Sequence, residues 1–142
     1  PLFKDNYPKF IRSLSKPLGK IAPRFRTVSP ITKRNLSTDK DVVSSYFKDP
    51  LVFRTFSFRL GSEITRIQDY VQENISNLKI PTIVLHGDND RVCPIDGNEK
   101  IMKLENVKFI TVNNSAHEIL NQDTRMFVLS EIHSWMKDNK II

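Results

Sequence analysis

Two short apolar runs, residues 82–85 and 107–112, form the clearest pattern in the chain. Both are rich in β-branched residues and bounded by turn-forming residues, which is typical of strands buried on both faces in a parallel sheet. Residues 94–104 between them have the length of a crossover helix, although Gly97 weakens a helix there by about 1 kcal/mol relative to Ala. The order of elements after Pro81 therefore predicts a parallel α/β unit.

Helical periodicity flanks this unit on both sides. A stripe spaced at three or four residues predicts a one-sided helix ending near Asn77, formed by Leu60, Ile64, Ile67, Val71 and Ile75. Residues 124–137 predict a final helix whose inward positions are Phe127, Val128, Ile132 and either Trp135 or Met136. Thr38 followed by Asp41 is close to a capping box and predicts a helix to about Phe47, which ends before Asp49 and Pro50.

The first 38 residues contain five of the eight prolines. Apolar positions spaced for one helical face occur among them, at Phe10, Ile11, Leu14, Leu18 and Ile21. Because proline interrupts a helix interior, we expect two short helices with a break at Pro17. Residues 24–35 show no clean period and predict a surface loop.

Two strands that are buried on both faces do not form a stable sheet on their own. The residues before Pro81 offer no good third strand, so we expect the rest of the sheet to lie outside this chain. The chain of 142 residues lacks an initiator Met, which also suggests a trimmed or partial chain. The expected fold class is α/β with an incomplete sheet.

The net charge of +6 comes from the first third of the chain. Residues 1–50 contain eleven Lys and Arg against four Asp, a balance of +7, while residues 51–142 contain eleven against twelve Asp and Glu, a balance of −1. Basic charge attracts nucleic acid or anionic lipid. Here the cations are scattered singly, which favours a solvated surface, and we expect no nucleic-acid partner.

No apolar stretch approaches the roughly 20 residues that span a bilayer, and the start of the chain lacks the apolar region of a signal peptide. The single cysteine, Cys93, excludes an internal disulfide and fits a reducing compartment. These features predict a cytoplasmic protein. We further expect the basic first third of the chain to make peripheral contact with a membrane surface.

An acidic residue and a histidine each follow one of the predicted strands. Asp88 and Asp90 come after the first strand, and Asp90 is the stronger candidate because Asp88 is placed to stabilise the loop. His117 follows the second strand. Since parallel strands end at the same sheet edge, Asp90 and His117 are predicted to lie together, like the acid and base of a nucleophilic triad. Taken singly, Asp90 is more simply explained as a turn former and His117 as a surface histidine. Of the other histidines, His86 is expected to be packed and His133 exposed.

The third member of a triad is missing from the sequence. The only glycines are Gly19, Gly61, Gly87 and Gly97, so no Gly-x-Ser-x-Gly elbow can be formed. No oxyanion loop of the His-Gly-Gly-Gly type is present either. Cys93 lacks the elbow of a nucleophile and is expected to fill space beside the site. The spacing of histidines and cysteine matches no metal site, and no glycine loop for phosphate occurs, so neither metal nor cofactor is expected.

Residues 78–94, LKIPTIVLHGDNDRVCP, resemble the acid-strand segment of α/β-hydrolase-fold serine hydrolases, in particular the monoacylglycerol lipase and lysophospholipase branch. The resemblance implies that Asp90, in the pattern Gly-x-x-Asp-Arg, is the triad acid. It also implies that His117, in a small-residue loop after the next strand, is the triad histidine. Ser115 stands where Gly is frequent and Gln122-Asp123 where Glu is usual, and these modest departures leave the assignment of His117 in place.

Residues 41–52, DVVSSYFKDPLV, resemble the cap that this family inserts before the acid strand. In complete relatives the cap forms a lid over an acyl-chain pocket. The resemblance therefore implies contact with a lipid-like ester substrate through Leu51, Val52, Phe53 and Phe56. It further implies that the first six strands, the oxyanion donors and the Ser elbow belong to an N-terminal half of the fold that this chain lacks.

Two functions are open on the sequence alone. The first is the C-terminal half of a serine hydrolase for carboxylic esters, with a helical cap at 1–78 and an α/β segment at 79–142 that carries the acid and the histidine. Alone, such a half is expected to be inactive. The second is a non-catalytic remnant or interaction module of the same fold. The upstream sequence distinguishes them, because a Ser elbow there favours the enzyme.

Overall fold

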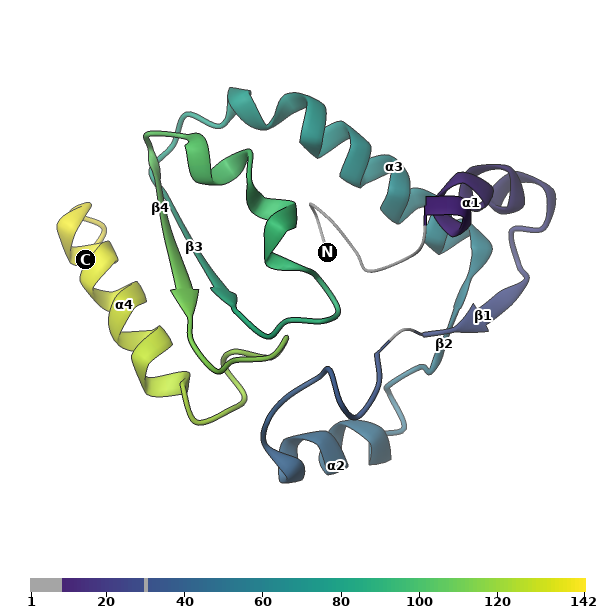
Figure 1. Ribbon diagram of the computed structural model, residues 1–142, viewed down its shortest axis with the longest axis horizontal. Helices are drawn as coiled ribbons and strands as arrows, with labels where there is room; N and C mark the ends of the chain where they lie inside the picture. Colours follow the sequence, from purple (N-terminus) through teal and green to yellow (C-terminus); the bar gives the residue numbers. More distant parts are fainter. Residues whose placement is uncertain (1–8, 30) are drawn as a thin grey trace.

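The computed structural model describes residues 9–29 and 31–142 (Figure 1). In chain order its elements are α1 (Lys9–Ile21), β1 (Arg26–Val28), α2 (Lys40–Lys48), β2 (Thr55–Ser57), α3 (Phe58–Asn74), η1 (Ile75–Asn77), β3 (Thr82–Gly87), η2 (Ile95–Asn98), η3 (Ile101–Lys103), β4 (Val107–Val112) and α4 (Arg125–Asp138), where η marks a 3₁₀ turn. Residues 1–8 and Pro30 of the predicted cap segment lie outside the described residues, as do the side chains of Phe10 and Ile11.

Strands β3 and β4 form a parallel two-stranded sheet in which Thr82 pairs with Val107 and Gly87 with Val112. Helix α4 lies on one side of this sheet and the turns η2 and η3 on the other (Figure 1). The predicted α/β unit with an incomplete sheet is thus confirmed. The expectation of strands buried on both faces is wrong for this chain, because in a sheet of two strands only Gly87 and Val112 are fully buried.

The connection between β3 and β4 consists of the 3₁₀ turns η2 and η3 instead of the α-helix expected at 94–104. Gly97 lies inside η2 and disfavours a regular helix there. The side chain of Asn98 is buried and holds the first turn by donating to the carbonyl oxygen of Ile95 at 3.2 Å. This irregular connection directs Asn98 toward the end of β3.

Helix α4 occupies the predicted place, but one of its expected inward positions is wrong. Val128 is 1% exposed, whereas its neighbour Phe127 is 46% exposed. Successive residues point about 100° apart around a helix, so these two side chains cannot both face the sheet. His133 is exposed, as expected.

Helices α2 and α3 begin at clear side-chain caps. Asp39 caps α2 by accepting hydrogen bonds from the N–H groups of Asp41 and Val42, so the cap lies one residue after the predicted Thr38. The helix ends at Lys48, ahead of Pro50, as predicted. Ser57 caps α3, and the predicted helix there is confirmed. None of the described helices has the length and apolar character needed to cross a membrane.

Helix α1 runs without interruption through Pro17, so the expected break is wrong. Ahead of the proline, polar side chains of α1 bond to α3: Arg12 to Gln68 at 2.8 Å, Ser15 to Thr65 at 3.1 Å and Lys16 to Asp69 at 2.7 Å. Gly19 lets the two helices approach closely, because a β-carbon there would collide with Ser62. Tertiary packing thus stabilises a helix that local rules would end.

The residues after α1 form a strand where a surface loop was expected. Strand β1 pairs in antiparallel fashion with β2, and Arg26 lies opposite Ser57. The rings of Phe25 and Phe58 stack beside this pair with centroids 5.9 Å apart. The expected loop at 24–35 is therefore wrong over these three residues, because a partner about 29 residues further along the chain supplies the pairing. The cap segment is accordingly not wholly helical.

Candidate active site

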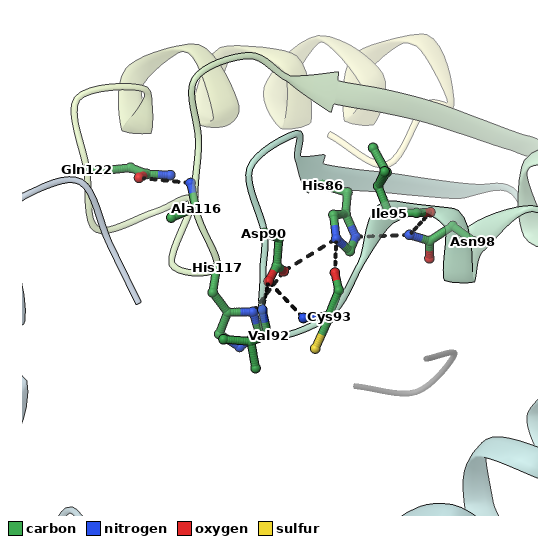
Figure 2. A network of polar contacts seen from close by, with 9 residues as sticks. All are labelled: His86, Asp90, Val92, Cys93, Ile95, Asn98, Ala116, His117 and Gln122. Carbon is green, nitrogen blue, oxygen red and sulfur yellow. Dashed lines mark hydrogen bonds and ion pairs between the residues drawn. The ribbon is translucent and has the colours of Figure 1, made fainter. Parts of the chain in front are cut away.

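Asp90 lies in the loop that follows β3, with its carboxylate turned into the molecule. Its Oδ1 accepts hydrogen bonds from the N–H groups of Val92 and Cys93, both at 2.8 Å. The side chain is 5% exposed. These two backbone donors fix the orientation of the carboxylate and direct Oδ2 toward the neighbouring loop (Figure 2).

The loop after β4 is bonded to the loop after β3 through Asp88 and Ser115. The Asp88 carboxylate accepts from the N–H of Ser115 at 3.1 Å, and the carbonyl of Ser115 accepts from the N–H of Asn89 at 2.9 Å. Gly87 permits this contact, since a β-carbon there would collide with the carbonyl oxygens of Ser115 and Ala116. Asp88 thus stabilises the loop, as the sequence analysis expected, and His117 is carried to Asp90.

His117 and Asp90 form a direct hydrogen bond, in which Nδ1 of the imidazole donates to Oδ2 of the carboxylate at 2.9 Å (Figure 2). The bond raises the pKa of His117 to about 10, with a second contribution from the side chain of Cys93, while burial opposes the rise. Burial favours the neutral acid at Asp90, yet the hydrogen bonds from His117 and His86 prevail and lower its pKa well below the usual value. At neutral pH the two side chains therefore form an ion pair.

A second histidine supports the Asp90 loop. His86 donates from Nε2 to the carbonyl oxygen of Cys93 at 2.8 Å, and the same nitrogen lies 3.4 Å from Oδ2 of Asp90. Its Nδ1 lies 3.0 Å from the amide nitrogen of Asn98. The carboxylate of Asp90 raises the pKa of His86. Burial and the charge of His117 oppose this rise.

His86 is expected from the sequence to be packed, but no sequence pattern indicates its contact with Asp90. The only local signal was a histidine immediately before the glycine that ends the strand, and this pattern specifies no partner for the side chain. No sequence pattern indicated a role for Asn98, because its contact with His86 depends on the irregular turn η2. His86 and Asn98 together extend the Asp90–His117 pair into a four-residue polar network (Figure 2).

Cys93 is buried beside the pair, at 7% exposure, which agrees with its expected place next to the site. Three side chains here offer atoms that could hold a metal ion: Asp90, Cys93 and His117. Their ligand atoms all lie within 4.8 Å of one another. The sequence spacing did not indicate it. Both carboxylate oxygens of Asp90 already accept hydrogen bonds, so an ion bound there would have to displace the contact with His117.

The four residues expected to contact substrate lie in different environments. Leu51 and Phe53 are 82% and 78% exposed, and the guanidinium of Arg26 lies 5.9 Å from the centroid of the Phe53 ring. Val52 is half-buried, and the half-buried ring of Phe56 lies against Gly61 of α3. Their contact with a substrate stays a prediction.

An acid and a histidine that meet beyond the carboxyl ends of adjacent parallel strands are characteristic of α/β hydrolases. Two solved structures share this chain's fold. A monoacylglycerol lipase from Paleococcus ferrophilus superimposes with a TM-score of 0.86 at 23% identity, over 96% of this chain and 56% of that one. A soluble variant of the Saccharomyces cerevisiae monoglyceride lipase, in complex with a substrate analogue, gives a TM-score of 0.80 at 20% identity, over 97% and 53%. The fold is that of an α/β hydrolase.

The chain belongs to the hydrolase family described as serine aminopeptidase, S33, whose model matches residues 1–124. Among curated relatives, the monoacylglycerol lipase of Mycolicibacterium smegmatis is 27% identical over 139 residues, which cover 93% of this chain and 48% of the relative. The resemblance to α/β hydrolases of the monoacylglycerol lipase type is thus confirmed. The chain spans about half the length of the curated relatives it matches.

Proposed function

We propose that this chain supplies the acid and the base of a serine hydrolase for carboxylic esters, and that an N-terminal half of the fold supplies the nucleophile. The observation that carries the proposal is the hydrogen bond between Asp90 and His117 at the carboxyl ends of two parallel strands. The absence of a Gly-x-Ser-x-Gly elbow in the sequence supports the division between two halves.

In this proposal His117 moves the proton and Asp90 orients it. Nδ1 of His117 is bonded to Asp90, so Nε2 is the atom that takes the proton from the serine hydroxyl and later gives it to the leaving alcohol. Asp90 holds the imidazole in the required tautomer and stabilises the imidazolium. The two backbone N–H groups on Oδ1 keep the carboxylate in place during both steps.

The protonation state of His117 gives a separate reason to expect no activity from this chain alone. With a pKa of about 10, the imidazole is already protonated at neutral pH, and a general base must begin neutral. Burial lowers the pKa of a histidine. Contact with an N-terminal half would bury His117 further and bring its pKa toward the range that catalysis needs.

The proposed substrate class is a lipid-like ester of the monoacylglycerol or lysophospholipid kind. Support comes from the relatives, which are named monoacylglycerol or monoglyceride lipases. The proposed contacts for the acyl chain are four apolar side chains in β2 and just before it: Leu51, Val52, Phe53 and Phe56. Docking of the basic cap at an anionic membrane is proposed as well, supported by the charge balance of residues 1–50.

The test uses the natural full-length protein and a fluorophosphonate probe, which labels an activated serine. We expect labelling of the full-length protein that is lost in the His117→Ala variant, and no turnover of a short-chain p-nitrophenyl ester by the 142-residue chain. If the isolated chain hydrolyses the ester and His117→Ala abolishes this turnover, the proposal that the nucleophile lies in an N-terminal half would be overturned. A full-length protein with no Ser elbow and no labelling would instead support the second candidate, a non-catalytic module of the same fold.

A further inference from the structure

A basic groove lies between α2 and the segments on either side of it. Its volume is about 630 Å³, and ten residues line it: Lys33, Arg34, Ser37, Thr38, Lys40, Val43, Ser44, Phe47, Lys48 and Arg54. Five of these residues are cationic, three carry hydroxyl groups and none is acidic. We call this surface the basic groove.

The cations of the basic groove are not neutralised by neighbouring carboxylates. None of its five Lys and Arg residues forms an ion pair with a residue that the structure describes. Two of the three acidic side chains nearby in sequence are bonded to backbone: Asp39 accepts from the first N–H groups of α2, and Asp49 accepts from the N–H of Leu51 at 2.8 Å. The third, Asp41, forms no ion pair with a described residue of the groove. The groove therefore concentrates positive charge that only a ligand or solvent ions can balance.

One of these cations is held in a fixed position. The guanidinium of Arg54 donates to the carbonyl oxygen of Phe47 at 2.5 Å and lies 5.3 Å from the centroid of the Phe47 ring. An arginine ordered in this way loses little conformational freedom when it binds an oxyanion, and its remaining N–H groups can engage two oxygens at once. A phosphate group suits this donor geometry better than a single carboxylate does, because it presents more oxygens to several cations.

The segment that lines the groove is also bonded to the loop that carries His117. The carbonyl of Leu36 accepts from the N–H of Glu118 at 3.0 Å, and the hydroxyl of Ser37 donates to the carbonyl of Asn121 at 2.9 Å. Leu36 is fully buried, at 0% exposure. One wall of the basic groove and the loop of the catalytic pair are therefore a continuous hydrogen-bonded unit.

We propose that the basic groove binds a phosphate group, and that its occupancy orders the loop that carries His117. The ligand bonds to the Arg54 guanidinium and to the lysine ammonium groups around it. Because the same segment holds Glu118, ordering it restricts the neighbouring His117. The inference does not depend on the proposed hydrolase activity, since binding is measured without turnover.

The test titrates the 142-residue protein with inorganic phosphate at constant ionic strength and follows its amide NMR spectrum. We expect saturable shifts at Thr38 and Ser44 in the groove and at Glu118 beside the catalytic histidine. Replacing Lys40→Gln together with Arg54→Gln should weaken binding by about tenfold or more, because two charge-assisted contacts are lost. If that variant fails to fold, Lys33→Gln with Lys40→Gln replaces it, since neither lysine has a described side-chain bond.

A control variant with the same change of charge, Lys79→Gln with Lys103→Gln, lies outside the groove and should bind phosphate like the parent. Equal weakening in both double variants, or shifts that never saturate, would overturn the proposal. A response in the groove with no shift at Glu118 would overturn the coupling to His117.

Two further arms identify the source of the phosphate. The first uses soluble glycerol phosphate, and the second uses phosphatidylcholine vesicles with and without phosphatidic acid. If the phosphatidic acid vesicles retain the parent protein and the control variant but not the groove variant, the site binds a lipid headgroup. Binding of glycerol phosphate with no preference for these vesicles assigns it to a soluble phosphate ester. If neither glycerol phosphate nor the vesicles bind, and inorganic phosphate also causes no response, the proposed phosphate site is contradicted.

Discussion

Gly87 at the end of β3 lies against the carbonyl oxygen of Ser115, so closely that a β-carbon at residue 87 would collide with it. The contact brings the two loops of the candidate site together. Gly87→Ala should therefore separate them and lower the free energy of unfolding by about 1–3 kcal/mol, as overpacking commonly does. Urea unfolding measures the loss, and the NMR signal of the Nδ1 proton of His117 reports the state of its bond to Asp90.

The matched control is Gly61→Ala. A β-carbon at residue 61 would lie 3.1 Å from the ring of Phe56, a side chain that can shift, and alanine favours the surrounding helix. This variant should unfold at or above the parent's urea concentration. If Gly87→Ala were equally well tolerated, the close approach of the two loops would not be required.

Asp90→Asn should lower the pKa of His117 from about 10 toward its ordinary value of 6.5. The hydrogen bond and the charge of Asp90 are the main causes of the raised value, whereas an asparagine can still accept the N–H groups of Val92 and Cys93. An NMR titration of the His117 ring measures the change. Persistence of the high pKa in this variant would show that Cys93, and not Asp90, controls it.

The same pair predicts how stability depends on pH. Since the pKa of His117 is higher in the folded chain, its stabilising contribution is complete below pH 6.5 and is lost as the pH rises through about 10. The lowered pKa of Asp90 acts in the opposite sense, because its contribution is lost as the pH falls below the unfolded value of 3.8. Urea unfolding between pH 6.5 and 10 should show this decline in the parent and a weaker decline in Asp90→Asn.

His86→Phe should raise the pKa of Asp90, because the carboxylate loses a hydrogen-bond donor. It should also lower the free energy of unfolding by about 1–3 kcal/mol, since the carbonyl of Cys93 loses its buried partner. Carboxylate NMR and urea unfolding measure the two effects. His133→Phe makes the same replacement on the exposed side of α4 and should change neither quantity. Stability lost without a change in the pKa of Asp90 would limit His86 to a packing role.

In the full-length protein, the two acids of the loop after β3 should differ in their effect on ester hydrolysis. Asp90→Asn should lower turnover by about 10⁴, the loss known for the corresponding change in a serine-protease triad. Asp88→Asn should retain most of the activity, because its Oδ1 can still accept from the N–H of Ser115. If Asp88→Asn lowered turnover more than Asp90→Asn, Asp88 and not Asp90 would be the acid that orients the histidine. Steady-state kinetics with a monoacylglycerol substrate provide the comparison.

The parts of the fold that local chemistry determines could be predicted from the sequence. The end of α2 before Pro50 follows from the geometry that proline imposes on its predecessor. The approach of Asp90 and His117 follows from the rule that parallel strands end at one sheet edge. Both inferences need only short-range patterns and one general rule of topology.

The parts that depend on distant partners could not be predicted. Helix α1 continues through Pro17 because α3, some fifty residues further on, bonds to it ahead of the proline and packs closely on Gly19 beyond it. The second nitrogen of His86 meets Asn98 because the connection after β3 forms the irregular turn η2. In each case the deciding contact joins residues whose separation in sequence carries no periodic signal.

The two-stranded sheet has a consequence for the exchange of its amide hydrogens with solvent. The N–H groups of Thr82 and Asp88 donate to carbonyls at the two ends of β4. Because donors alternate along a strand, even-numbered residues of β3 such as Val84 are protected by β4, whereas odd-numbered residues such as Leu85 direct their N–H groups to the opposite edge. A strand added by another polypeptide would slow exchange only in the odd-numbered set, so β3 can report, residue by residue, when the sheet is extended.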